Sequence, residues 1–295
     1  MRTLKGSSLL IERGGDLELK KVSLSTFSYL PNLTLVDQLR SLITSLFSAG
    51  EQGAFYIPRP VVNGTQALFQ DAAGTVAVTA DGDPDGLMID QSPNSINASQ
   101  SVSSQRPVYQ TDGTLHWLLP DGADDDLNVG LALDHEEFTC VVAYRAGGDN
   151  QRLFDNRGTG APGAAKGWQI KARNDMLAIV SLDDGSGSSV YWSGSGAVSP
   201  GLDEDVVITI AYQSGQAIYR INGVDQGPPT ASGGGLAAMG SIVTGIDGVL
   251  FTARNSGAQS FSGRFYGGVL VNKYLGTSDI EKTESYFASL AGITL

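Results

Sequence analysis

The feature that most constrains the fold is a regular succession of short apolar segments that starts near Leu115 and runs almost to the C-terminus. In 208–212 (ITIAY), apolar and polar side chains alternate with a period of two, as a sheet with one buried face requires. Turn residues separate such segments at intervals of roughly 8–12 residues, which is typical of an antiparallel sandwich or jelly roll. The expected strands are 115–119, 127–131, 138–145, 151–156, 167–173, 176–182, 189–192, 205–212, 216–221, 248–254 and 261–272.

The composition agrees with a large β domain. The chain has 295 residues with 38 glycines, 11 prolines and 17% charged residues, which suits many turns between short strands. A chain of this size can bury an adequate core. We therefore expect a mainly β protein, built as an antiparallel β-sandwich with short helical additions.

Charge and hydropathy exclude several classes of partner. The net charge is −12, so Lys and Arg are too few to neutralise a phosphate backbone, and we expect no nucleic-acid partner. No apolar run reaches the ~18 residues of a membrane span, so no membrane insertion is expected. The N-terminus lacks the features of a signal peptide, which predicts folding in a cytoplasm. The single Cys140 excludes an internal disulfide and is expected to be a small buried residue.

A helix is expected at 35–48, where apolar residues recur at helical spacing. Thr34 provides the N-cap and Gly50 the stop. So broad an apolar face must be buried, either on the back of the sandwich or in a helical cluster around the symmetry axis of an oligomer. Both alternatives stay open at this point. The candidate assembly residues are Leu35, Leu39, Leu42, Ile43 and Leu46.

The chain divides into three parts. Residues 1–50 form an N-terminal attachment segment, in which apolar runs on both sides of Gly14-Gly15 predict a hairpin ahead of the helix. Residues 51–110 form a lead-in segment with short strands at 54–57, 75–79 and 87–89, and 111–295 form the sandwich. A Ser-x-x-Glu capping box at 278–281 predicts a C-terminal helix that ends at 290.

Four segments carry a resemblance to a known family. They are 68–71 (LFQD), 80–84 (ADGDP), the Ser/Asn/Gln-rich 91–110 (QSPNSINASQSVSSQRPVYQ) and 121–126 (DGADDD). Together they resemble bacteriophage virion proteins, many of them tail-associated, in which such a segment leads into a concanavalin-like (laminin-G-like) β-sandwich. The hairpin at 211–223 and the segment 261–272 are similar to the same domains. The resemblance covers roughly residue 46 to the C-terminus.

The resemblance implies a virion structural protein, made in the host cytoplasm and released by lysis. Its N-terminal segment is expected to attach to other virion proteins, and a homo-oligomer is expected, with a trimer favoured. The displayed sandwich suits a tail-fibre, baseplate or adhesion component that contacts host surface glycan. A capsid decoration protein and a non-phage carbohydrate-binding lectin or adhesin are the alternatives, and a glycan-cleaving enzyme is the least favoured.

Asp121, Asp124 and Asp125 are the candidate metal ligands, with calcium as the candidate ion, because a hard cation prefers several clustered oxygens. The alternative is a turn in which Asp side chains accept backbone N–H bonds. The segment 81–86 (DGDPDG) matches only the first half of a calcium loop, since Ser92 stands where the final Glu belongs. A structural turn is expected there.

Candidate sugar contacts lie at loop tips and on aromatic side chains. Polar residues in this role form hydrogen bonds and aromatic residues stack on the sugar ring, although a large aromatic on a strand is more often part of the core. The candidates are Asp155, Asn156, Arg157, Trp168, Tyr191 and Trp192.

The sequence offers little for catalysis. His116 and His135 are the two histidines, and neither has the spacing of a metal motif. The carboxylates of 202–206 stand at the start of a strand, whereas glycosidases place a carboxylate pair at the cleft. The Gly/Ser run around 194–196 lacks the strand–turn–helix context of a nucleophile elbow. We expect no enzymatic activity and no cofactor other than the candidate calcium.

Overall fold

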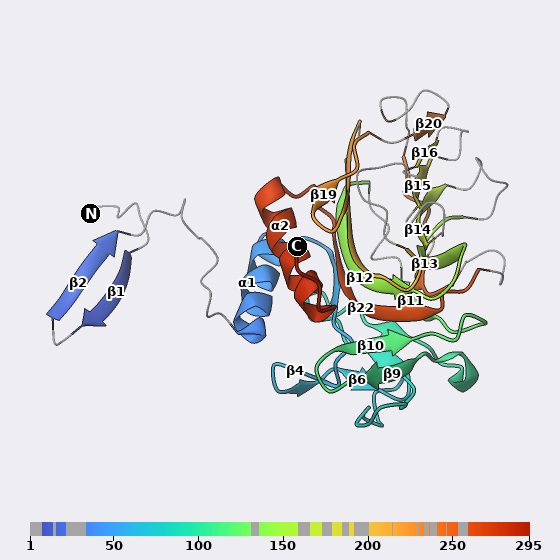
Figure 1. The fold of residues 1–295 in the computed structure, drawn as a ribbon, viewed down its shortest axis with the longest axis horizontal. Helices are drawn as coiled ribbons and strands as arrows, with labels where there is room; N and C mark the ends of the chain where they lie inside the picture. The colour runs from blue at the N-terminus through green and yellow to red at the C-terminus, as the bar shows by residue number, and fades with distance from the viewer. Residues whose placement is uncertain are drawn as a thin grey trace.

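The chain folds into two antiparallel sheets packed face to face, with two helices on the outer face of one sheet (Figure 1). The computed structural model describes residues 8–13, 16–21, 34–130, 136–158, 166–172, 179–184, 189–191, 201–213, 215–228, 230–232, 236, 241–245, 247–252 and 259–295. The predicted antiparallel β-sandwich is confirmed. None of the helices in these ranges is both long enough and apolar enough to cross a membrane.

Counted over the described residues, the helix-covered sheet has eight strands. Seven follow the order β19-β18-β17-β12-β22-β10-β9, and β3 pairs with β22 beside β10. All pairs are antiparallel. The bounds are β3 (Gly53–Tyr56), β9 (Val108–Thr111), β10 (His116–Leu119), β12 (Phe138–Ala146), β17 (Asp205–Gln213), β18 (Gln216–Ile221), β19 (Val224–Asp225) and β22 (Gly263–Val271).

The opposite sheet has ten described strands in the order β20-β16-β15-β14-β13-β21-β11-β8-β7-β6. Two further pairs stand outside both sheets, β1 (Ser8–Arg13) with β2 (Asp16–Lys21) and β4 (Val61–Val62) with β5 (Thr65–Gln66). The strands of the ten-stranded sheet are β6 (Leu68–Phe69), β7 (Leu87–Met88), β8 (Ala98–Ser99), β11 (Leu127–Gly130), β13 (Gln151–Asp155), β14 (Gly167–Ala172), β15 (Ile179–Asp183), β16 (Ser189–Tyr191), β20 (Thr230–Ser232) and β21 (Gly248–Leu250).

Strand β12 is buried on both faces. Cys140 and Val142 face the core between the sheets, whereas Val141 and Ala143 face the helical layer. Two-sided burial explains why this segment is apolar almost throughout, while sheets with one solvated face alternate. The prediction for Cys140 is confirmed, and burial raises the pKa of its thiol to about 12.

The lead-in segment contributes strands to both sheets. β3 and β9 join the helix-covered sheet, and β6, β7 and β8 extend the ten-stranded one. The boundary predicted at residue 110 therefore falls inside the sheets. The strand expected at 75–79 is not formed, because this stretch pairs only through the isolated bridge Phe69–Ala77.

The N-terminal helix α1 spans Leu35–Phe47, close to the prediction, and Thr34 caps it by accepting the N–H of Asp37. Its apolar face packs within the chain, in one cluster with the outer face of the helix-covered sheet and with α2 (Thr277–Leu290). Of the two alternatives for the predicted assembly residues, burial on the sandwich of the same chain is the one that the structure shows. Leu39, Leu42 and Leu46 are buried in the chain's own core, and Leu35 and Ile43 are partly buried against it.

Helix α2 begins two residues earlier than its sequence signal predicts. Its N-cap is Gly276, and Ser278 lies inside the helix, so the predicted capping box is wrong. Hydrogen bonds fix the chain just before this point, because Tyr274 N–H donates to Glu137 and Leu275 N–H donates to the Thr139 hydroxyl. These tertiary contacts set the start of the helix.

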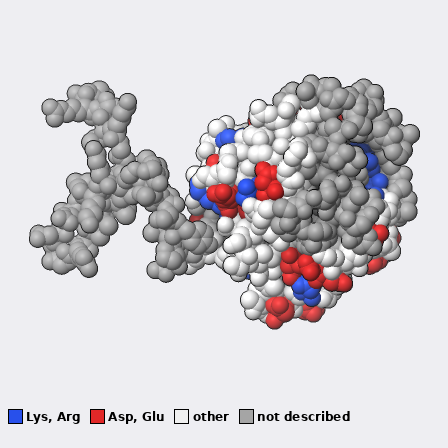
Figure 2. Space-filling model, turned by 45° about the horizontal axis from the view of Figure 1, so that its top comes forward, with Lys and Arg blue, Asp and Glu red and all other residues white. Residues whose placement is uncertain are grey.

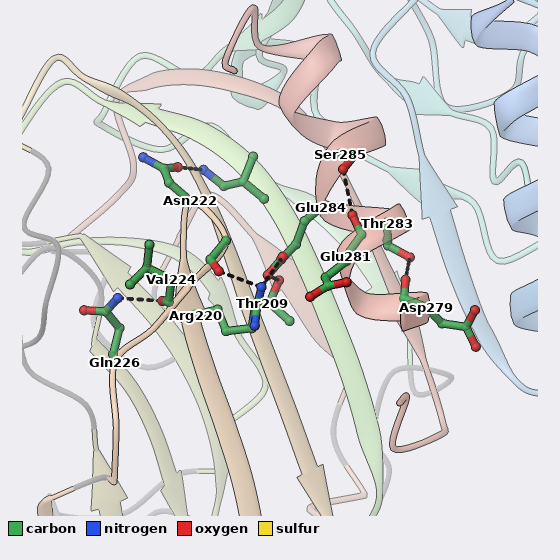
Figure 3. A network of polar contacts seen from close by, with 12 residues as sticks. Thr209, Arg220, Asn222, Val224, Gln226, Asp279, Glu281, Thr283, Glu284 and Ser285 are labelled. Carbon is green, nitrogen blue, oxygen red and sulfur yellow. Dashed lines mark hydrogen bonds and ion pairs between the residues drawn. The ribbon is translucent and has the colours of Figure 1, made fainter. Parts of the chain in front are cut away.

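A buried ion pair holds α2 on the sheet (Figure 3). Glu284, 1% exposed, accepts from Arg220 Nε at 2.9 Å and Nη2 at 3.1 Å. It also accepts from the Thr209 hydroxyl at 2.7 Å. Arg220 in turn donates to the carbonyl of Gly223. One carboxylate thereby joins the helix to two neighbouring strands, β17 and β18.

We predict that Glu284→Ala lowers the free energy of unfolding by about 3–5 kcal/mol, because it leaves the half-buried charge of Arg220 without its partner. Urea denaturation measures the change. Glu281→Ala, an exposed position on the same helix, is the control and should change the free energy by less than ~0.5 kcal/mol. Equal effects of the two substitutions would contradict the role assigned to Glu284.

Candidate functional site

The segments of the predicted family resemblance meet at one place in the fold. Arg106 donates to the carbonyls of Gln70, Gln100 and Ser101 at 2.8–3.0 Å. Gly86 lies beneath the guanidinium, where an added Cβ would stand 2.9 Å from Arg106 Nε and 2.8 Å from the Gln70 carbonyl. Only a residue without a side chain leaves room for this contact.

We call the place where segments 68–71, 80–84, 91–110 and 121–126 meet the joint. Backbone hydrogen bonds complete it. Asp85 N–H donates to the carbonyl of Pro107, and Tyr109 N–H donates to that of Asp83. The 121–126 loop is attached in the same way, since Asp126 N–H donates to the carbonyl of Gln105. Burial raises the pKa of the Asp85 carboxyl well above its usual value, against the opposing effects of the Leu87 and Phe69 amides and the Arg106 charge. The 81–86 segment is a structural turn, as expected, because Asp81 and Asp83 accept separate backbone N–H groups.

An open groove of about 610 Å³ lies between this joint and the rim of the sandwich. Its polar lining comes from both sides, with Arg106 and the exposed Ser104 from the lead-in segment and Ser262 from the start of the last strand. The lining residues are Ser104, Arg106, Val108, Leu119, Pro120, Asp121, Asp125, Gly147, Ser262 and Gly263. The groove is of the size that small ligands occupy.

The predicted metal ligands come together at the edge of this groove. Each of Asp121, Asp124 and Asp125 offers a carboxylate oxygen, and these oxygens lie within 4.8 Å of one another. The loop is also a turn of the alternative kind, because Asp121 Oδ1 accepts the N–H of Ala123 at 2.7 Å and Asp125 Oδ2 accepts the N–H of Asp121 at 2.8 Å. Three carboxylates fit a hard cation such as Ca²⁺, which takes further oxygens from backbone or water.

Asp125 is the buried member of this cluster, at 5% exposure. Its pKa is raised to about 6, mainly by burial and in smaller part by the neighbouring carboxylates, against the hydrogen bond from Asp121 N–H. On the face that Figure 2 shows, the described Asp and Glu side chains gather in separate clusters with Lys or Arg beside some of them. A cation bound between Asp121, Asp124 and Asp125 relieves the repulsion among their carboxylates.

The structure corrects three of the six predicted sugar contacts, because Asp155, Asn156 and Trp168 are buried. Trp168 is 1% exposed and packs in the core between Phe138, which stacks on it, and the tilted ring of Phe154, with ring centroids 4.4 and 4.3 Å away. Asn156 is buried, and its side chain accepts the N–H of Trp168. Alternating strand positions place Trp168 on the inner face, which its residue type alone does not reveal. For Tyr191 only the backbone is described, and Trp192 lies outside the described residues.

Asp155 and Arg157 are not free loop tips either. Asp155 ends β13, is fully buried, and pairs with both Arg152 and Arg157. Arg157 is partly exposed, so it is the one residue of the predicted set described here with side-chain surface left for a ligand.

Two of the three carboxylates of 202–206, those of Glu204 and Asp205, accept hydrogen bonds within the chain. Asp205 accepts from Arg145 and from the Tyr266 hydroxyl, and Glu204 accepts the N–H of Gly201. His116 contacts the Tyr109 hydroxyl, and burial lowers the pKa of its imidazole. His135 and the 194–196 run lie outside the described residues.

Comparisons with known proteins give remote structural matches. No family model matches the chain, and no curated protein does. The binding domain of botulinum neurotoxin serotype D is 13% identical, over 79% of this chain and 51% of that one, with a TM-score of 0.49. Domain 4 of an arabinanase from Geobacillus stearothermophilus, in complex with arabinotriose, is 12% identical over 63% and 81%, with a TM-score of 0.44. A Ruminococcus gnavus sialidase CBM40 bound to sialyllactose is 16% identical over 51% and 84%, with a TM-score of 0.39.

These matches establish neither ligand nor activity for this chain. All three identities are below 20% and all three TM-scores are below 0.5. The chain also spans only about half of the neurotoxin domain.

We predict that Asp125→Asn stabilises the protein at neutral pH and has no such effect near pH 4. The folded-state pKa of Asp125, about 6, exceeds its usual value, so ionising this group costs stability as pH rises from about 4 to 7. Asn keeps the acceptor for Asp121 N–H but carries no charge. The gain in free energy of unfolding should be on the order of 2 kcal/mol at pH 7.5, measured by urea denaturation across this range. A gain that does not change with pH would contradict the assignment.

Calcium provides a second arm of the same experiment. If the three carboxylates bind Ca²⁺, millimolar CaCl₂ raises the melting temperature of the wild type at pH 7.5 and leaves that of Asp125→Asn nearly unchanged. The turn would be the sole role of this loop if MgCl₂ raised the melting temperature of the wild type as much as CaCl₂ does, and if CaCl₂ raised that of Asp125→Asn by the same amount.

Proposed function

We propose that this protein is a non-enzymatic, lectin-like binding protein of a bacteriophage virion, which contacts host surface glycan through the groove beside Arg106. The observation that carries the proposal is the groove itself, because it joins an open volume of about 610 Å³ to a polar lining from two parts of the chain. Hydroxyl, carboxylate and guanidinium groups at such a rim suit the many hydroxyls of a sugar.

The place of the protein in a virion is supported by the segments that resemble phage proteins. Residues 68–71, 80–84, 91–110 and 121–126 are separate segments of the sequence, yet they form one hydrogen-bonded joint around Arg106. A common structural role explains why these segments occur together in one chain. Tail fibre, baseplate and adhesion component are the favoured positions, with capsid decoration and a non-phage lectin or adhesin as the alternatives.

Attachment to the particle is assigned to the N-terminal segment. Its hairpin β1–β2 pairs with no other described strand, and a lone two-stranded hairpin is marginally stable in water. Contact with other virion proteins, or with further copies of the chain, would supply the missing partner surface. A trimer is the favoured copy number.

We predict that glycan binding depends on the groove. On a glycan array that includes arabinose oligosaccharides and sialylated glycans, the wild type should give defined hits. Ser104→Trp fills the groove from its exposed rim and should lower these signals at least tenfold. Ser103→Trp adds the same bulk next to it, outside the groove lining, and should leave them unchanged. An array without hits, or equal binding by both variants, would count against the proposal.

The oligomer is tested separately. Sedimentation equilibrium at micromolar concentration should give a mass three times that of the 30.8 kDa chain. Deletion of residues 1–33 should return the mass to that of one chain, because α1 and the sandwich pack within the chain. A single-chain mass for the full-length protein would contradict the trimer.

A further inference from the structure

A second polar cluster lies on the outer face of the ten-stranded sheet. In β14, Trp168 and Ile170 face the core, so Gln169 and Lys171 between and beyond them face outward. The register pairs Arg152 with Lys171 and Asp155 with Gln169, across an irregularity between Arg152 and Phe154. The outer face of these two strands therefore carries three ionisable side chains and an amide.

One carboxylate holds two guanidinium groups in this cluster. Asp155 Oδ2 lies 2.7 Å from Arg152 Nη1, and Asp155 Oδ1 lies 3.1 Å from Arg157 Nε and 3.0 Å from the Arg157 N–H. Asp155 is fully buried, whereas the Arg152 and Arg157 side chains are 12% and 15% exposed. The buried Asp155 carboxylate thereby fixes the orientation of both arginine side chains.

The charges of Arg152, Arg157 and Asp155 do not sum to zero. Two guanidinium groups face one carboxylate, and among the described residues Asp155 is the acid that pairs with either arginine. Arg152 Nε is buried and has no hydrogen-bond partner among them. Burial lowers the pKa of Arg152, Asp155 raises it, and the charge of Arg157 lowers it again. An unbalanced charge held out of water is costly unless a further anion pairs with it.

We infer that Arg152 and Arg157 form a subsite for the carboxylate of an acidic sugar, with Asp155 as the residue that positions them. Arg157 already uses Nε and Nη2 on Asp155. The end-on edge of its fork, formed by Nη1 and the second N–H of Nη2, matches a further carboxylate through two parallel hydrogen bonds.

The subsite is linked to the groove along β13. Gln151 precedes Arg152, and its side chain hydrogen-bonds Ser262 of the groove lining at 2.8–3.1 Å. This inference rests on the proposed glycan binding and adds a ligand class to it. An acidic glycan is expected to be preferred over its neutral counterpart.

The test compares methyl β-D-glucuronide with methyl β-D-glucoside, two sugars that differ only in the carboxylate, by NMR titration of the full chain at low salt. We expect at least tenfold tighter binding of the acid, with an affinity that falls as NaCl is raised. Arg157→Gln should abolish this preference, and Arg157→Lys should restore only part of it, because Lys keeps the charge without the fork. Arg40→Gln, an exposed position on α1 with the same change of charge, should leave it intact.

Several results would overturn the inference. They are equal affinity for the two glycosides, an acid preference that persists in folded Arg157→Gln, or acetate binding as tightly as the glucuronide. Should Arg157→Gln fail to fold, the salt dependence and Arg157→Lys still decide the question. Failure of the groove is distinguishable, because Ser104→Trp should leave the monosaccharide preference unchanged.

Discussion

The candidate site depends on one guanidinium group, that of Arg106. Its three hydrogen bonds reach carbonyls of Gln70, Gln100 and Ser101, and bonds of this charge-assisted kind stabilise by roughly 1.5–3 kcal/mol each. These carbonyls lie on two segments that directly follow β6 and β8, with Gln70 on one and the adjacent Gln100 and Ser101 on the other. By holding them together, Arg106 turns the lead-in segment into a fixed wall, and the groove is the space between that wall and the sandwich rim.

The sandwich supplies the rigid side of the groove. β12 lies between β17 and β22, buried toward the other sheet on one face and toward the helices on the other. Glu284 and Arg220 attach α2 to this sheet from outside. The last strand starts at Gly263, next to Ser262 of the groove, so the position of the rim follows from the central pairing. Ligand contact is thus assigned to a place where a well-packed scaffold meets loops fixed by hydrogen bonds.

The sequence predicts features that depend on local spacing. The helical recurrence of Leu39, Leu42 and Leu46 predicts both α1 and its buried face, and the contiguous carboxylates of 121–126 predict a cluster that the fold does bring together. Spacing does not reveal what covers an apolar face. The alternative of an oligomer could therefore be decided only when α1 was seen packed within the chain.

Features that depend on register or on distant residues were not predictable. Asp155 resembles a loop-tip acid in sequence, yet a one-residue irregularity in β13 and its pairing with β14 place it beneath two arginines. Trp168 suits a sugar platform or a core equally well until its face of the strand is known. Ser262 reaches the groove from far along the chain, and no local pattern indicates this. Arg106 is visible in the sequence, but its partners are backbone carbonyls, which every residue has.

Amide hydrogen exchange of the wild type and of Arg106→Gln shows whether Arg106 forms the groove. We predict that the N–H groups of Gly86, Gln100 and Asp126, which bond across the joint, lose protection together while those of β12 and β17 keep theirs. Unchanged protection of the joint, or equal loss across both sheets, would contradict the role of Arg106 as the contact that forms the groove.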